Sequence, residues 1–356
     1  MKTSKKFVYI FSLTLVFFLM FSFFTYHKYV KYVNPTDYVI GDLVRMSYHK
    51  GLALPRYNEF NLSKRHIHYN DYKKQNVDMI TIGDSFSNGG GGGLNRYYQD
   101  YIATYNELDV LNIPQLSGTN SYLETVVLLC NSGWLERKKI KYVLIGSVQR
   151  FVIDRFAKDI NYDLNTDANI DQEIISSYDS YNPKDEDKQQ ITFINNLNLN
   201  ALTYNLNFLV KGYGKNKKYY IEKLNNDFFT SEIKNELLFF YDDIRVLKDE
   251  TLKNIKKVND NFNNLAKLLS NKGIKLYFMP SVDKYNLYSR YITSNKYTQS
   301  VLFEELRKLP KEYILIDTKN ILSKEIESGA KDIFYPDETH WSYKASKAIF
   351  KSVKIE

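Results

Sequence analysis

Short apolar runs separated by amphipathic stretches occupy two parts of the chain, one before and one after its middle. The apolar runs are the strands that the pattern predicts: 76–82, 109–113, 141–146, 273–280 and 313–317. The stretches between and after them have the spacing of helices that bury one face: 94–107, 121–130, about 247–271, 297–308 and a last helix from about Ser342. Strands that alternate with helices predict a parallel sheet with helices on both faces, so the expected fold class is α/β.

The alternation is interrupted between the third and fourth predicted strands. Residues 156–245 are rich in Asn, Asp, Tyr and Lys and contain amphipathic pieces such as LLFFYDDIRVL. Aromatic residues recur throughout this interval, whereas disordered linkers are poor in them. We therefore expect a mostly helical insertion in the α/β domain rather than a disordered linker.

The N-terminus carries a different pattern, an uncharged and almost wholly apolar run. Residues 7–26 follow Lys2, Lys5 and Lys6, and the run is about as long as a helix that crosses a bilayer. A cleaved signal peptide is the alternative, but the run continues into FFTYHKY and has no small-x-small cleavage site. The pattern favours an uncleaved N-terminal transmembrane helix.

A short tail, an anchor and one large body predict the organisation of the chain. The expected parts are a cytoplasmic tail and anchor at 1–30, a juxtamembrane segment at 31–75 and a catalytic domain at 76–356. We expect a single-pass membrane protein whose domain is extracytoplasmic, either periplasmic or at the cell surface. The net charge of +8 is spread along the chain without a nucleic-acid-binding motif, so we expect no nucleic-acid partner. Cys130 is the single cysteine and can form no internal disulfide.

The stretch TIGDSFSNGGGGGL places a serine, Ser85, where the first predicted strand ends, and five glycines follow. A phosphate-binding loop needs Gly-Lys-Ser/Thr after its glycines, but this run closes with Leu-Asn-Arg. The sequence therefore excludes a phosphate loop. The glycines are interpreted as a mobile loop that leaves space at the rim of a site, and Ser85 as a candidate nucleophile.

A nucleophilic serine needs a base to accept its proton and an acid to orient that base. Four of the five histidines, His27, His49, His66 and His68, precede the α/β domain, and His66-x-His68 is either half of a metal site or surface decoration. The remaining one, His340, stands just before the last predicted helix. Asp337 precedes it by three residues, a spacing that lets a carboxylate reach Nδ1 while Nε2 faces the serine. The alternative for Asp-x-x-His is a helix N-cap and a surface histidine.

The motifs GDSF, residues 83–86, and DETHW, residues 337–341, resemble blocks one and five of the SGNH (GDSL-like) hydrolase superfamily. The resemblance covers 76–150 and 273–350 and implies a three-layer, flavodoxin-like α/β/α fold with Ser85, His340 and Asp337 as the catalytic triad. The surroundings of GDSF, the His-Trp pair and PSVDKY, residues 280–285, are similar to the extracytoplasmic SGNH-like proteins that O-acetylate polysaccharides, of the alginate O-acetylation type. The serine-first order is that of the plain hydrolases, so the superfamily is the firmer resemblance.

The same resemblance suggests where an oxyanion would be bound. NIPQLSGTNS, residues 112–121, is similar to the block whose glycine amide lines the oxyanion hole, which points to Gly118 together with the amide of Ser85. The superfamily usually has Gly-x-Asn-Asp after the third strand, but this chain has Gly-Ser-Val-Gln-Arg, residues 146–150. A third donor is expected from Gln149 or Asn120, and a missing donor can cost roughly two to three orders of magnitude in rate.

Two cations are candidates for contacts with an acidic sugar, Arg150 and Lys284. The alternative is that Gln149 and Arg150 pair with a surface carboxylate. No cofactor and no metal is expected, since the chemistry requires neither.

The resemblance implies an O-acetyltransferase that forms an acyl-serine and modifies hydroxyls of a cell-envelope or exported polysaccharide. It further implies a multi-span membrane acyltransferase as the partner that supplies acetyl groups. Two alternatives remain: a carbohydrate O-acetylesterase of the same fold, and a non-catalytic glycan-binding or assembly subunit.

Overall fold

The computed structural model describes residues 2–33, 41–56, 61–67, 71–181, 192–211, 218–294 and 296–356. Its centre is a five-stranded sheet whose strands pair in parallel in the order β2-β1-β3-β6-β7. The strands are β1 (Met79–Ile82), β2 (Val110–Ile113), β3 (Tyr142–Val148), β6 (Lys275–Ser281) and β7 (Ile314–Leu315). Each lies within one of the predicted apolar runs or overlaps it closely, and the α/β class is confirmed.

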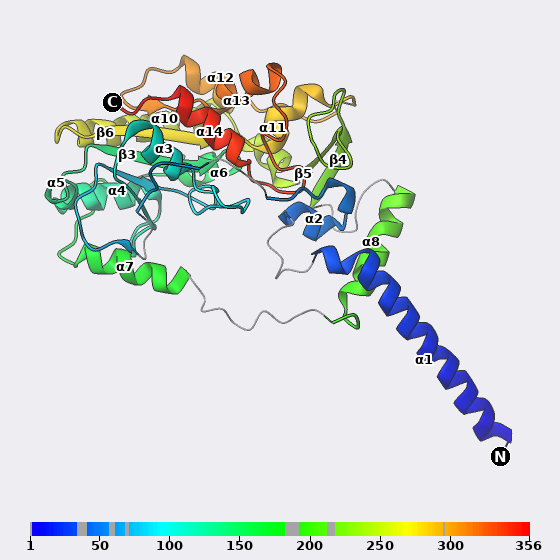
Figure 1. Ribbon diagram of the computed structural model, residues 1–356. Coiled ribbons are helices and arrows are strands. Elements are labelled where there is room, and N and C mark those ends of the chain that lie inside the picture. Colours follow the sequence, from blue (N-terminus) through cyan, green and yellow to red (C-terminus); the bar gives the residue numbers. More distant parts are fainter. Residues whose placement is uncertain are drawn as a thin grey trace.

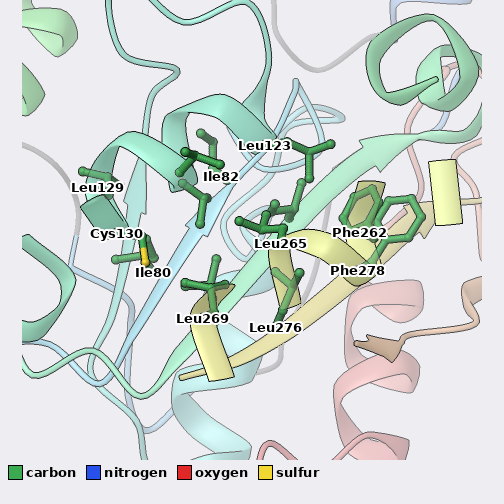
Figure 2. Packing of buried hydrophobic residues seen from close by; sticks show 14 of the residues in the cluster. Ile80, Ile82, Leu123, Leu129, Cys130, Phe262, Leu265, Leu269, Leu276 and Phe278 are labelled. Atoms are coloured by element: carbon green, nitrogen blue, oxygen red, sulfur yellow. The ribbon is translucent and has the colours of Figure 1, made fainter. Parts of the chain in front are cut away.

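Helices cover both faces of this sheet. Successive side chains of a strand point to opposite faces, and because these strands carry apolar side chains on both faces, both faces must be buried. Ile80 and Ile82 of β1 belong to the core under α4 (Tyr122–Asn131) and α10 (Leu252–Ser270), which also contains Cys130 (Figure 2). Met79 belongs to the core on the other face, under α3 (Tyr98–Asn106) and α14 (Tyr343–Ser352). The remaining helices of the body are α5 (Trp134–Arg137), α6 (Gln149–Phe156), η4 (Val246–Asp249), α11 (Lys284–Tyr288), η5 (Ser289–Tyr291), α12 (Leu302–Lys308) and α13 (Thr318–Glu327).

The strand order reverses beside β1. Successive connections leave β1 toward β2 on one side and reach β3 on the other, so the order reverses between β1 and β3. In open parallel sheets a ligand site forms outside the carboxyl ends of the strands at such a point. The GDS turn directly follows β1, and α6 directly follows β3, so both reach this edge of the sheet.

The insertion is not purely helical. It contains α7 (Ile170–Tyr181), α8 (Leu197–Lys211) and the short α9 (Asp242–Arg245), but also an antiparallel pair formed by β4 (Tyr219–Lys223) and β5 (Glu236–Phe240). The expected insertion at 156–245 also includes 182–191 and 212–217, which lie outside the described residues.

The N-terminal helix α1 (Lys2–Lys28) projects away from the body (Figure 1). Its apolar side chains are exposed, and within it Ser4–Lys28 is long and apolar enough to cross a membrane once. The chain continues through η1 (Val30–Val33), α2 (Asp42–Ser47) and η2 (Lys50–Leu52). We call residues 41–56 the juxtamembrane clamp, because they contact the loop that carries His340.

Candidate active site

Ser85 is exposed in a tight turn that directly follows β1. The preceding carboxylate holds the turn: Asp84 accepts hydrogen bonds from the backbone N–H of Val148 at 2.7 Å and of Phe86 at 3.1 Å, and it pairs with Arg155. A Cβ on Gly83 would lie 2.2 Å from the Ser87 Oγ and 2.8 Å from the carbonyl oxygen of Gly146. Only glycine fits there, so the chain can turn sharply and present Ser85 at the edge of the sheet.

The structure brings His340 to this serine from 255 positions away. The His340 Nε2 lies 2.7 Å from the Ser85 Oγ, within hydrogen-bond distance. The other ring nitrogen, Nδ1, lies 2.8 Å from the Oε1 of Glu338. The ring of Phe86 packs on the imidazole with the centroids 4.7 Å apart. A hydroxyl, an imidazole and a carboxylate therefore form one hydrogen-bonded row.

The carboxylate in that row is Glu338. The prediction that Asp337 contacts the His340 Nδ1 is wrong. Asp337 is fully buried and accepts hydrogen bonds from the Arg56 Nη1 at 2.9 and 3.0 Å and from the Gly41 N–H at 2.9 Å. The prediction assumed that, in a turn leading into a helix, a carboxylate three residues before the histidine can reach its Nδ1. The backbone is not yet helical here, since α14 begins only at Tyr343, and Asp337 points toward the juxtamembrane clamp.

A second carboxyl group, Asp42 of the juxtamembrane clamp, lies against Glu338. It accepts hydrogen bonds from the Thr339 N–H at 2.8 Å and from the Thr339 Oγ1 at 2.6 Å. Burial raises the pKa of Asp42 to about 7, and the charge of Glu338 acts in the same direction. Burial alone would raise the pKa of Glu338, but the hydrogen bond and charge of His340 outweigh it and lower that pKa to about 2. The two shifts have opposite directions: Asp42 holds a proton more tightly than an ordinary carboxyl, and Glu338 favours the ionised form that faces the imidazole.

The Asp42→Asn variant should become more stable relative to the wild type as the pH rises from about 4 to about 7. The pKa of Asp42 is 3.8 in the unfolded chain and about 7 in the folded protein. In the wild type, the stability that the protonated carboxyl contributes is therefore complete below pH 3.8 and is lost as the pH rises through about 7. Asparagine keeps one acceptor and one donor without titrating. The difference in unfolding free energy should reach at most about 4 kcal/mol and then stay constant. Urea unfolding across this pH window measures it, and a difference independent of pH would contradict the assignment of the proton.

Arg56 contacts three separate segments of the site, and the sequence did not predict it as a site residue. Besides Asp337, its Nε donates to the carbonyl of Gly91 at 2.7 Å, and its guanidinium lies 4.1 Å from the centroid of the Tyr335 ring. Its side chain is only 5% exposed. Nothing in the polar pattern of the juxtamembrane segment distinguishes this arginine from solvated ones, because its partners are distant in sequence.

The glycine run packs on the histidine, whereas its composition predicted a mobile loop at the rim of the site. The Gly90 N–H donates to the carbonyl of Ser85 at 2.7 Å. A Cβ on Gly90 would lie 2.4 Å from the His340 Nε2, so any larger residue would have to displace the ring. Gly91 has a φ of +91°, which favours glycine. These two glycines let the backbone approach the imidazole closely.

The side chains of Gln149 and Arg150 pair with carboxylates of the protein, as the alternative expected, but these carboxylates are buried rather than at the surface. The Gln149 Nε2 donates to Ser300 at 2.5 Å and to Glu250 at 3.2 Å. Arg150 is paired with two further acids, Asp283 at 2.8 Å and Asp243 at 3.1 Å, and its side chain is 9% exposed. With these partners neither side chain is available as an oxyanion donor or as a contact to an acidic sugar, so both predictions are wrong.

Lys284, the other expected sugar contact, is also buried. Its Nζ donates to the backbone carbonyls of Tyr335 at 2.8 Å and Pro336 at 2.7 Å, and to that of Glu338 at 3.2 Å. Burial lowers the pKa of Lys284 to about 7, although several carboxylates nearby act in the opposite direction. The lysine braces the loop that carries Glu338 and His340, and its burial contradicts a role at the polymer surface.

Gly118 and Asn120 lie in the loop that follows β2, the strand next to β1. Both are exposed, and Gly118 has a φ of +75° with open space where a Cβ would be. The backbone N–H of Asn120 donates to Glu124 at 2.7 Å, which leaves its exposed side-chain amide as the group able to reach a ligand. The loop is at the same edge of the sheet as Ser85, and the two residues stay candidate oxyanion donors.

Among the described residues, one group has the composition of a metal site: Asp42, Glu338 and His340, whose ligand atoms lie within 4.8 Å of one another. A metal there would have to break the bond between His340 Nδ1 and Glu338, and the geometry already satisfies these groups without one. In the other histidine motif, His66 Nδ1 lies 2.6 Å from the Asp100 carboxylate, and His68 lies outside the described residues.

A comparison with protein-family models found no match, and a comparison with curated proteins found no significant match. What the site can do therefore follows from its geometry. An exposed hydroxyl whose proton can pass to an imidazole, with a charged carboxylate on the far ring nitrogen, is the arrangement that acyl transfer through a serine requires.

Proposed function

We propose that this protein is a membrane-anchored O-acetyltransferase of the SGNH type, in which Ser85 carries an acetyl group to hydroxyls of a cell-envelope or exported polysaccharide. The observation that carries the proposal is the row from the Ser85 Oγ through the His340 ring to Glu338, with contacts of 2.7 and 2.8 Å. The resemblance of GDSF and DETHW to the SGNH blocks supports the same chemistry from the sequence.

In the first half-reaction His340 Nε2 accepts the proton of Ser85 as the Oγ bonds to the acetyl carbonyl carbon. The backbone amides of Ser85 and Gly118 are the candidate donors to the oxyanion, with the Asn120 side chain as the third. The tetrahedral intermediate then expels the donor's leaving group, which takes the proton from His340, and acetyl-Ser85 remains. Glu338 stays ionised throughout and stabilises the imidazolium that forms in each step.

In the second half-reaction His340 accepts the proton of an acceptor hydroxyl, and that oxygen bonds to the acetyl carbon. Ser85 leaves with the proton returned by His340, so the enzyme is regenerated and the acceptor carries the ester. A sugar hydroxyl as acceptor makes the protein a transferase, and water makes it an esterase. The apolar helix α1 and the resemblance to polysaccharide O-acetylating proteins favour the transferase, with the acetyl group supplied by a multi-span membrane acyltransferase.

Intact-protein mass spectrometry of the full chain in detergent, after mixing with p-nitrophenyl acetate, tests this proposal. We expect a mass gain of one acetyl group, located on Ser85 by peptide mapping, and no gain in the Ser85→Ala variant. Subsequent addition of polysaccharide fragments should remove the label faster than water does and yield acetylated sugar. Acetylation that persists in Ser85→Ala would refute the nucleophile, and loss of the label to water alone at the same rate would identify an esterase.

A further inference from the structure

Helix α8 exposes an apolar surface that the fold of the body does not cover. Leu199, Leu206 and Val210 lie at spacings that place them on one face of the helix, and they are 63%, 53% and 76% exposed. Leu209, at the edge of this face, is 87% exposed. The opposite side of α8 is buried through Ala201 and Tyr204, so the helix has a packed side and an apolar side without a partner in the described structure.

The apolar surface continues onto the helix that is long enough to cross a membrane. Helix α8 contacts the C-terminal part of α1, and the rings of Phe23 and Phe193 lie 6.4 Å apart. Phe193 and Ile194, just before α8, are also exposed. In Figure 1, α8 crosses the C-terminal end of α1 rather than running along it. A helix that crosses the end of a membrane span lies near the level of the lipid headgroups.

The sequence segments that include α8 and α1 carry basic but no acidic side chains. Residues 189–221 contain no Asp or Glu but four lysines, and residues 1–36 also contain no acid. Beside the apolar face, Asn200 and Thr203 of α8 line a cavity of about 320 Å³ together with Arg45 and Lys218. Apolar side chains bordered by cations are the composition of helices that lie in the interface of an anionic membrane.

We propose that α8 lies in the surface of the membrane that α1 crosses. Leu199, Leu206, Leu209 and Val210 are then inserted among the lipids, and Arg45 and Lys218 of the adjacent cavity face anionic headgroups. This inference rests on the membrane span in the proposed function. A single span leaves a domain free to rotate and tilt, whereas a span and an interfacial helix together hold the body at one height and orientation. The consequence is a defined position of Ser85 relative to the membrane, from which the acetyl group is expected to arrive.

Fluorescence quenching in vesicles tests the inference with the full chain. A polarity-sensitive dye is attached to single cysteines introduced by Leu206→Cys or Leu209→Cys, with Val16→Cys in α1 and Val301→Cys beside α12 as references. The wild-type chain is the labelling blank, because Cys130 is buried. The vesicles contain phosphatidylcholine and phosphatidylglycerol at high dilution of protein. Nitroxide lipids report contact with the bilayer, and iodide reports exposure to water.

We expect the dye at 206 and 209 to be quenched by nitroxide lipids and severalfold less by iodide than the dye at 301. If the dye at position 16 is in the bilayer but the dye at positions 206 and 209 is as accessible to iodide as the dye at position 301, the inference is overturned and the membrane span stands. If 16 itself is open to iodide, the span fails and the inference fails with it. Protection at 206 and 209 that appears only at high protein density would assign the surface to a second copy of the chain and also overturn the inference.

Discussion

Glu338→Gln should slow the acetylation of Ser85 by roughly 10³- to 10⁴-fold while leaving the fold intact. Glutamine has the size of glutamate, and its side-chain oxygen can still accept the hydrogen bond that the Asp42 N–H donates to Oε2 of Glu338. It carries no charge to stabilise the imidazolium. Its amide can also donate to Nδ1, which favours the tautomer that has its proton on Nε2 and cannot accept one from Ser85. The rate is measured by mass spectrometry during reaction with p-nitrophenyl acetate, and circular dichroism checks the fold.

The matched control is Asp337→Asn, at the neighbouring residue. Asp337 contacts Arg56 and Gly41 but not the imidazole, so this variant should stay within about 10-fold of the wild-type acetylation rate once folded. The reverse outcome, an active Glu338→Gln and an inactive Asp337→Asn, would mean that the loop reorganises to the arrangement that the sequence spacing predicts.

Asp337→Ala should instead destabilise the protein by about 3 to 5 kcal/mol. Removing this carboxylate leaves the guanidinium of Arg56 buried without its closest charged partner, since the two side chains are 5% and 0% exposed. The juxtamembrane clamp also loses the acceptor of the Gly41 N–H. Urea unfolding of the full chain in detergent, followed by tryptophan fluorescence, measures the loss.

A double-mutant cycle separates the ion pair from other effects of the substitution. In Arg56→Met the buried charge is absent, so the further substitution Asp337→Ala should cost much less than it does in the wild type. Equal costs in both backgrounds would show that the pair contributes nothing and that Asp337 acts only through the backbone of residues 41–56.

The strands, their parallel pairing and the proximity of Ser85 and His340 were predicted from the sequence. Apolar runs such as 76–82 report burial directly, and their alternation with helical spacing leaves a parallel sheet as the simplest solution. The turn after such a strand places Ser85 at the carboxyl edge. His340 was identified because the other four histidines precede the α/β domain, and the structure places it 2.7 Å from the serine.

Which of the two neighbouring carboxylates contacts the imidazole was decided by tertiary structure alone. Asp337 and Glu338 are adjacent and chemically alike, and the residue that faces the imidazole depends on the conformation of a non-helical turn. That turn is held by Arg56 and Lys284, and Asp337 contacts Gly41, 296 positions away. Local patterns carry no information about such partners.

The same limit applies to the polar side chains next to the site. Gln149, Arg150 and Lys284 have the chemistry of ligand contacts, but burial gave each of them a partner within the protein. A polar group removed from water must be paired, and the pairing is fixed by which elements pack together. The sequence by itself determined the strands, the turn that presents Ser85, and His340 as its partner. Only the packed structure decided which carboxylate contacts the imidazole, because that contact depends on segments hundreds of residues apart.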